Sequence, residues 1–70
     1  MIEETIKKII FDKFKLEVSE NTNVAEFVED SMAKIEMLFE IEQALGRKFD
    51  EEDLLSIETV GDIFRIAKKS

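Results

Sequence analysis

The chain has 70 residues, 17 acidic and 10 basic, which give a net charge of −7, and 44% of its residues are hydrophobic. With no Cys and no His, it offers no disulfide framework, thiolate nucleophile, zinc-finger ligands or Ser-His triad. The net negative charge argues against binding to nucleic acid or anionic membranes, because a protein that binds either one needs a basic surface. The length predicts one domain, residues 1–70, and the charge predicts a basic protein as its natural partner.

The first residues lack the basic head and apolar run of a signal peptide, and no apolar stretch approaches the roughly 20 residues of a membrane span. We therefore expect a cytoplasmic protein that does not insert into membranes. The absence of Pro and the many Glu, Lys, Ile and Leu residues predict an all-α fold.

The first predicted helix covers residues 2–14. Its apolar residues recur every three or four positions and predict one buried stripe, made of Ile2, Ile6, Ile9, Ile10 and Phe14. Phe11 falls off that stripe. Residues 16–30 lose the period and predict a long ordered loop without a helix of its own. The expected anchors of this loop are Leu16, Val18, Val24, Phe27 and Val28.

The strongest helical pattern covers residues 31–45 and ends at Gly46, a typical C-terminal stop. Apolar spacing predicts an inward face of Met32, Ile35, Leu38, Ile41 and Leu45, widened by Met37 and Phe39. The acidic residues Glu36, Glu40 and Glu42 are expected on other faces, at the surface.

Two further helices complete the predicted fold. Residues 50–57 favour a short helix that carries Leu54 and Leu55. Thr59 and Asp62 have the spacing of a capping box, which opens a last helix with Val60, Ile63, Phe64 and Ala67 facing inward. The expected architecture is a small helical bundle of three longer helices and one short helix, with a long loop between helices 1 and 2.

Negative charge is concentrated in the middle of the chain. Residues 17–64 sum to −11, whereas residues 1–16 sum to +1 and residues 65–70 to +3. One interpretation is a charged, solvated surface that maintains solubility. The other is a docking face for a positively charged partner.

The acidic residues do not form a recognisable metal or catalytic site. Counted from Asp50 as an EF-hand loop, the sixth position is Leu55 instead of Gly, and the twelfth is Gly61 instead of Glu. Loose binding of divalent cations to this acidic run stays open. The carboxylates between residues 36 and 42 have no evident pocket, so we predict no catalytic residue and no metal site.

Ser31 admits two hypotheses. It is either the N-cap of the helix over residues 31–45, or a hydroxyl that carries a modification at a helix start. Backbone N–H groups and the helix dipole favour a phosphate at such a position. No base lies nearby in the sequence, so chemistry at Ser31 would need another enzyme.

The chain resembles the acyl carrier protein family along essentially its whole length. The resemblance rests on Asp30-Ser31-Met32, on Ile35-Glu36-Met37-Leu38, on Phe49-Asp50-Glu51-Glu52 and on the run from Ile57 to Ile63. It implies that Ser31 is the attachment site of 4′-phosphopantetheine, installed from coenzyme A by a phosphopantetheinyl transferase. The arm would also supply the thiol that a chain without Cys lacks.

The resemblance further implies a carrier, not an enzyme, that presents acyl or aminoacyl thioesters to partner enzymes of fatty-acid, polyketide or related biosynthesis. The acids expected to dock on basic patches of those enzymes are Asp30, Glu36 and Glu42, with Glu29 and Glu40 adding to the field. Apolar contacts near the arm would come from Met32, Ile35 and Phe39. We expect a monomer. The alternative is an acidic helical interaction module without a prosthetic group, in which Ser31 is only a cap.

Overall fold

Four α-helices and one short 3₁₀ turn make up the computed structural model, which describes residues 2–69. The helices are α1 (Ile2–Phe14), α2 (Ser31–Leu45), α3 (Glu51–Ser56) and α4 (Val60–Lys69), and the 3₁₀ turn is η1 (Val24–Glu26). The predicted all-α bundle of three longer helices and one short helix is confirmed. The expectation of a long loop without a helix is corrected by η1, a single turn within that loop.

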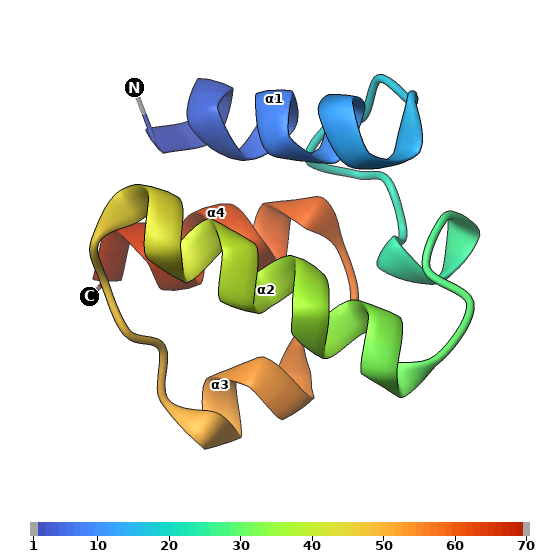
Figure 1. The fold of residues 1–70 in the computed structure, drawn as a ribbon. Helices are drawn as coiled ribbons and strands as arrows, with labels where there is room; N and C mark the ends of the chain where they lie inside the picture. Colours follow the sequence, from blue (N-terminus) through green and yellow to red (C-terminus); the bar gives the residue numbers. More distant parts are fainter. Residues whose placement is uncertain (1, 70) are drawn as a thin grey trace.

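Helix α1 packs against both α2 and α4, and α3 lies on the opposite side of the bundle (Figure 1). One core joins all parts of the chain, and α4 contributes most to it, through Val60, Ile63, Phe64, Ile66 and Ala67. The buried residues of α1 are Ile6 and Ile10. The start of α1 and the end of α4 lie at one end of the molecule, and α2 begins at the other (Figure 1). No helix within residues 2–69 has the length and apolar character needed to cross a bilayer.

The loop between α1 and α2 is held by the backbone at the start of α4. The Val24 N–H donates to the Glu58 carbonyl at 2.8 Å, and the Val60 N–H donates to the Thr22 carbonyl at 2.9 Å. The Gly61 N–H donates to the Glu20 carbonyl at 2.9 Å. A Cβ at Gly61 would lie 2.8 Å from that same carbonyl oxygen, so glycine permits the close approach. These bonds keep the loop ordered despite its length.

Side chains anchor the same loop to the core. Val24 and Val28 are buried, and the Phe27 ring meets the Phe14 ring of α1 edge-on, with centroids 5.1 Å apart. Leu16, expected to be an anchor, is exposed, and so is Phe11 of α1. The predicted anchoring is therefore wrong at Leu16.

Helix α2 has apolar residues on two sides, of which only one faces the core. Met37, Leu38 and Ile41 are buried, and Leu45 is partly buried. Three residues of the predicted inward face are exposed instead, namely Met32, Ile35 and Phe39. The apolar spacing in α2 is too broad to mark a single stripe, which is why the inward prediction is wrong for these three. The helix ends at Gly46 in the left-handed conformation (φ 66°), as predicted.

Candidate functional site

Ser31 is the first residue of α2, and its neighbour Asp30 caps the helix. The Asp30 backbone is extended (φ −148°, ψ 175°), and its Oδ1 accepts a hydrogen bond from the Ala33 N–H at 2.8 Å. The hypothesis that Ser31 is the N-cap is therefore wrong, because the carboxylate one residue earlier performs that role. The Ser31 side chain is exposed, and within the described residues its hydroxyl has no hydrogen-bond partner.

A groove of about 540 Å³ lies beside Ser31. It is bordered by the start of α2, the turn η1 and the connection between α3 and α4. Its lining residues are Asn23, Val24, Ala25, Val28, Glu29, Asp30, Ser31, Lys34, Ile57 and Glu58. Three of the lining residues are acidic and one, Lys34, is basic. The groove residues therefore carry a net negative charge and include a single cation.

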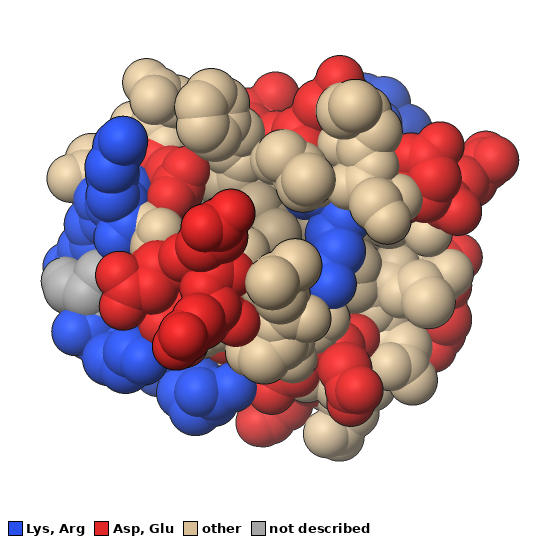
Figure 2. All heavy atoms as spheres, turned by 90° about the horizontal axis from the view of Figure 1, so that it is seen from below, with Lys and Arg blue, Asp and Glu red and all other residues tan. Residues whose placement is uncertain are grey.

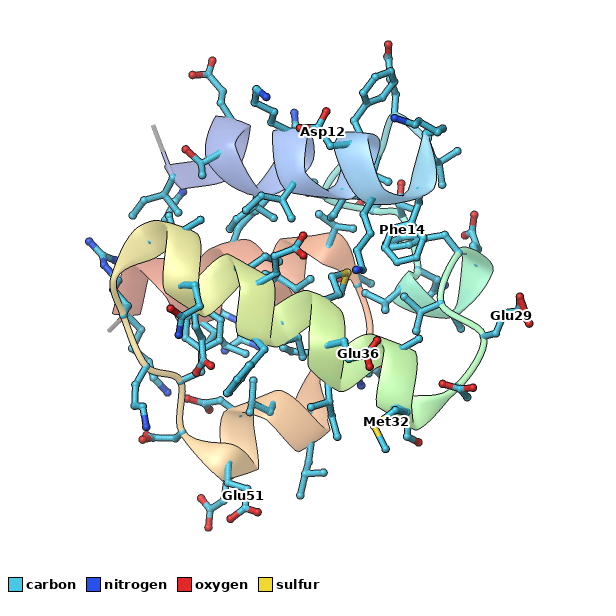
Figure 3. The ribbon with its side chains drawn as sticks, viewed as in Figure 1. Asp12, Phe14, Glu29, Met32, Glu36 and Glu51 are labelled. Carbon is cyan, nitrogen blue, oxygen red and sulfur yellow. The ribbon has the colours of Figure 1, made fainter. Side chains whose placement is uncertain are left out.

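Exposed apolar side chains lie on α2 beyond Ser31 and continue onto α3. Met32 is 66% exposed, Ile35 53%, Phe39 60%, and Leu55 of α3 80%. Figure 3 shows Met32 and Glu36 projecting from the first half of α2, with Glu29 pointing away from the loop before it. Figure 2 shows this lower face of the molecule, where uncharged residues lie between groups of acidic side chains. A second groove, of about 410 Å³, opens between α2 and α3 and includes Ile35 and Phe39 in its lining.

The predicted acidic residues have different environments. Glu36 is exposed, and Asp30 is exposed although its carboxylate caps α2. Glu42 is buried (8% exposed), and its Oε2 accepts a hydrogen bond from the Phe49 N–H at 2.6 Å. The expectation that Glu42 lies at the surface is wrong. Its position in α2 lets the carboxylate satisfy a buried backbone donor in the segment between α2 and α3.

Comparison with known proteins decides the family. A family model described as the phosphopantetheine attachment site matches residues 4–66. The acyl carrier protein of Thermotoga maritima is 32% identical over 68 residues, which cover 91% of this chain and 84% of that relative. The chain belongs to the acyl carrier protein family.

An acyl carrier protein is a carrier and not a catalyst, and its covalent cofactor is 4′-phosphopantetheine. It receives this group from a phosphopantetheinyl transferase and interacts with enzymes that process its cargo. The start of α2 fits such a group, because the Ser31 hydroxyl, which has no hydrogen-bond partner among residues 2–69, lies there at the edge of an open groove. The amide groups and dipole of a 15-residue helix favour a phosphate at this end.

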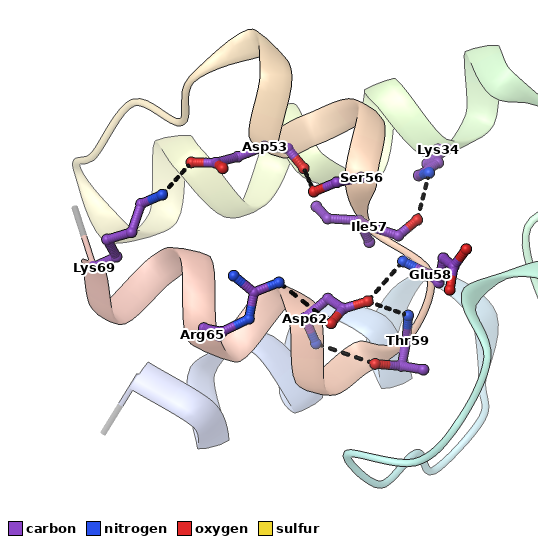
Figure 4. A network of polar contacts seen from close by, with 9 residues as sticks. All are labelled: Lys34, Asp53, Ser56, Ile57, Glu58, Thr59, Asp62, Arg65 and Lys69. Atoms are coloured by element: carbon purple, nitrogen blue, oxygen red, sulfur yellow. Dashed lines mark hydrogen bonds and ion pairs between the residues drawn. The ribbon is translucent and has the colours of Figure 1, made fainter.

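The segment after α3 borders the groove and is fixed by a polar network (Figure 4). Asp62 Oδ2 accepts from the Thr59 N–H at 3.0 Å and from the Glu58 N–H at 2.9 Å, and the Asp62 N–H donates to Thr59 Oγ1 at 3.2 Å. The predicted capping box is therefore confirmed. Hydrogen bonds from the Thr59 and Glu58 backbones, and then the Arg65 guanidinium, hold the pKa of Asp62 below its ordinary value.

One residue of the acidic run at the start of α3 forms an ion pair that stabilises the fold. Asp53 pairs with Lys69 of α4 across 2.9 Å, which ties the short helix to the end of the chain. Within residues 2–69, no group of three or more acidic side chains is arranged to hold a metal ion.

Two residues of the candidate site were missed by the sequence analysis. Lys34 lines the groove, and its spacing of three from Ser31 along a helix is a signal that could have placed it there. Leu55 extends the exposed apolar surface onto α3. Its side could not be predicted, because six residues of helix are too few to define a periodic face.

Proposed function

We propose that Ser31 is the residue to which 4′-phosphopantetheine is attached. The observation that carries this proposal is the division of roles at the start of α2, where Asp30 caps the helix and leaves the Ser31 hydroxyl exposed and unpartnered among the described residues. Residues 4–66, which match the family model, include this serine. The Asp30-Ser31-Met32 sequence agrees with the family signature.

In this proposal the chain holds and orients the phosphopantetheine arm, and the arm supplies the reactive group. Ser31 supplies the hydroxyl oxygen, the α2 N-terminus favours the phosphodiester, and the groove gives the arm a surface to follow. When bound, the arm supplies a thiol that forms thioesters with acyl or aminoacyl groups. No Cys or His of this chain can replace it, since the sequence contains neither.

The test is intact-mass spectrometry after incubation with coenzyme A and several phosphopantetheinyl transferases. We expect the wild-type chain to gain one phosphopantetheine mass and Ser31→Ala to gain none. Ser56→Ala is the matched control, because Ser56 is an exposed serine on α3, and it should be modified like wild type. A chain that gains no mass with any transferase would instead support the acidic interaction module without a prosthetic group.

We also propose that the exposed face of α2 and α3 is a docking surface. It would bind to basic patches on the partner enzymes. Met32, Ile35 and Phe39 would provide apolar contact, and Asp30 and Glu36 the charge. Their exposure supports this role. Glu42 is left out of the proposal because its carboxylate is buried against Phe49. Docking of this kind is fast and salt-sensitive, as a carrier that visits several enzymes requires.

Charge reversal tests the docking face. Glu36→Lys should raise the KM of the transferase for the carrier several-fold at low salt, and the effect should shrink as ionic strength rises. Glu17→Lys makes the same charge change in the loop after α1 and should leave the KM near wild type. Equal effects of the two variants would refute the proposed face.

The monomeric state, the cytoplasmic location and the single domain over residues 1–70 stay predictions.

A further inference from the structure

Lys34 has an unusual position in this molecule. It is the only basic residue between Lys15 and Arg47 in the sequence. It lies on α2 three residues after Ser31, and side chains at this spacing on a helix are neighbours, about 5–6 Å apart at Cβ. Both residues line the same groove, together with the acidic residues Glu29, Asp30 and Glu58.

The Lys34 ammonium already makes one contact that spans the groove. Its Nζ donates to the Ile57 carbonyl oxygen at 2.7 Å, in a partly buried position (Figure 4). Ile57 is itself buried and follows the last residue of α3. The bond therefore joins the first turn of α2 to the connection between α3 and α4.

That connection also supports the rest of the groove. The Glu58 carbonyl accepts from Val24 of η1, and the Glu58 N–H donates to Asp62 of α4. Lys34 thus bridges α2 to a segment that is fixed from two other sides. A lysine ammonium has three donors, so the bond to Ile57 leaves two available for a further acceptor.

We propose that Lys34 binds the phosphodiester attached to Ser31 while keeping its bond to Ile57, so that loading the arm tightens α2 against the segment after α3. This inference rests on the proposed attachment at Ser31. A phosphodiester adds one negative charge to a groove that is lined by three acidic residues, and Lys34 is the one basic residue among the groove residues described. A charge-assisted bond to the phosphate offsets this repulsion. Lys34 is a positioning residue in this proposal, because it orients the base of the arm and takes no part in thioester chemistry.

The experiment compares the melting temperature of each variant before and after loading with phosphopantetheine. For wild type we expect loading to raise the melting temperature by about 2–4 °C at low salt. Lys34→Arg keeps the charge and should retain most of this gain. Lys34→Gln keeps a donor for Ile57 but loses the charge, and its gain should disappear. Lys7→Gln removes an equal charge from an exposed position on α1 and should behave like wild type.

Each variant is compared with its own unloaded form, so the cost of a weakened bond to Ile57 cancels. A second measurement uses the wild-type chain alone, so that it does not depend on any variant folding. Loading should shift the NMR resonances of the Lys34 side-chain Cε and Nζ, and added salt should reduce this shift.

The outcomes separate the two proposals. If mass spectrometry shows no loading, the attachment at Ser31 fails and this inference fails with it. If loading is complete but Lys34→Gln gains as much stability as wild type, or the Lys34 resonances do not move, the attachment stands and the role of Lys34 is refuted.

Discussion

Two adjacent polar residues share the start of α2, and each has a separate task. Asp30 satisfies the Ala33 N–H, which would otherwise be one of the unpaired donors of the first helical turn. Ser31 is thereby released from capping and keeps an exposed hydroxyl. For the attachment proposed at Ser31, a cap one residue earlier leaves the hydroxyl accessible to a transferase.

This division predicts unequal costs for two alanine substitutions in the unmodified chain. Asp30→Ala should lower the free energy of unfolding by about 1 kcal/mol, because the cap is lost. Ser31→Ala should change it by less than about 0.5 kcal/mol, because the exposed Ser31 hydroxyl makes no hydrogen bond to any other residue that the structure describes. Urea denaturation measures both values, with Asp30→Asn as a control that keeps a capping side chain. A cost at Ser31 equal to that at Asp30 would contradict the cap seen here.

At the scale of the elements, the start of α4 is fixed by side-chain hydrogen bonds. Its capping box joins Thr59 and Asp62 reciprocally, and the same carboxylate also holds the Glu58 N–H. Because Glu58 borders the groove and contacts the loop through Val24, the cap of α4 helps to shape the site beside Ser31. Stability of α4 and geometry of the groove are therefore linked through one aspartate.

The lowered pKa of Asp62 gives this element a defined pH dependence. The folded state favours the charged carboxylate, so its contribution is complete above the ordinary aspartate pKa of about 4 and is lost as pH falls through the lower folded value. Asp62→Ala should cost about 1 kcal/mol at pH 7, and its difference from wild type should shrink below about pH 4.

Urea denaturation between pH 7 and pH 3 measures this difference. Asp50→Ala is the control, because Asp50 is the N-cap residue of α3 but its side chain makes no capping bond. A difference between Asp62→Ala and wild type that stays constant down to pH 3 would show that the charge of Asp62 does not contribute.

At the scale of the whole molecule, charge is separated along the bundle. On the face shown in Figure 2, most of the basic side chains gather at the end where α1 begins and α4 ends, whereas groups of acidic side chains are spread among uncharged residues over the face. Among the described residues, three acids of segment 17–64 form ion pairs, namely Glu40, Asp53 and Asp62. The site at the start of α2 therefore faces away from the basic end.

Such crowding predicts a stability that depends on salt. Most of the 14 acids in residues 17–64 repel one another without a paired cation, so raising NaCl or adding Mg²⁺ should raise the melting temperature by screening. Thermal denaturation followed by circular dichroism, at low and high ionic strength, measures the effect. A melting temperature indifferent to both salts would mean that these carboxylates are too far apart to interact.

Much of the fold could be predicted from the spacing of apolar and capping residues three or four positions apart in the sequence. The bounds of α1 and α2, the stop at Gly46 and the box between Thr59 and Asp62 depend on contacts within one or two helical turns, which the sequence displays directly. Ser31 was identified as a candidate in the same way, from its place before a periodic apolar run.

Contacts between distant segments decided the rest. Glu42 is buried because Phe49 presents a backbone donor to it, and Lys34 spans a groove because Ile57 presents an acceptor. Neither partner lies on the same helix, so no local period can reveal the contact. The sequence by itself determined where the four α-helices lie and which serine starts α2. Only the tertiary structure decided which polar side chains are free for function, because that depends on what the neighbouring segments offer them.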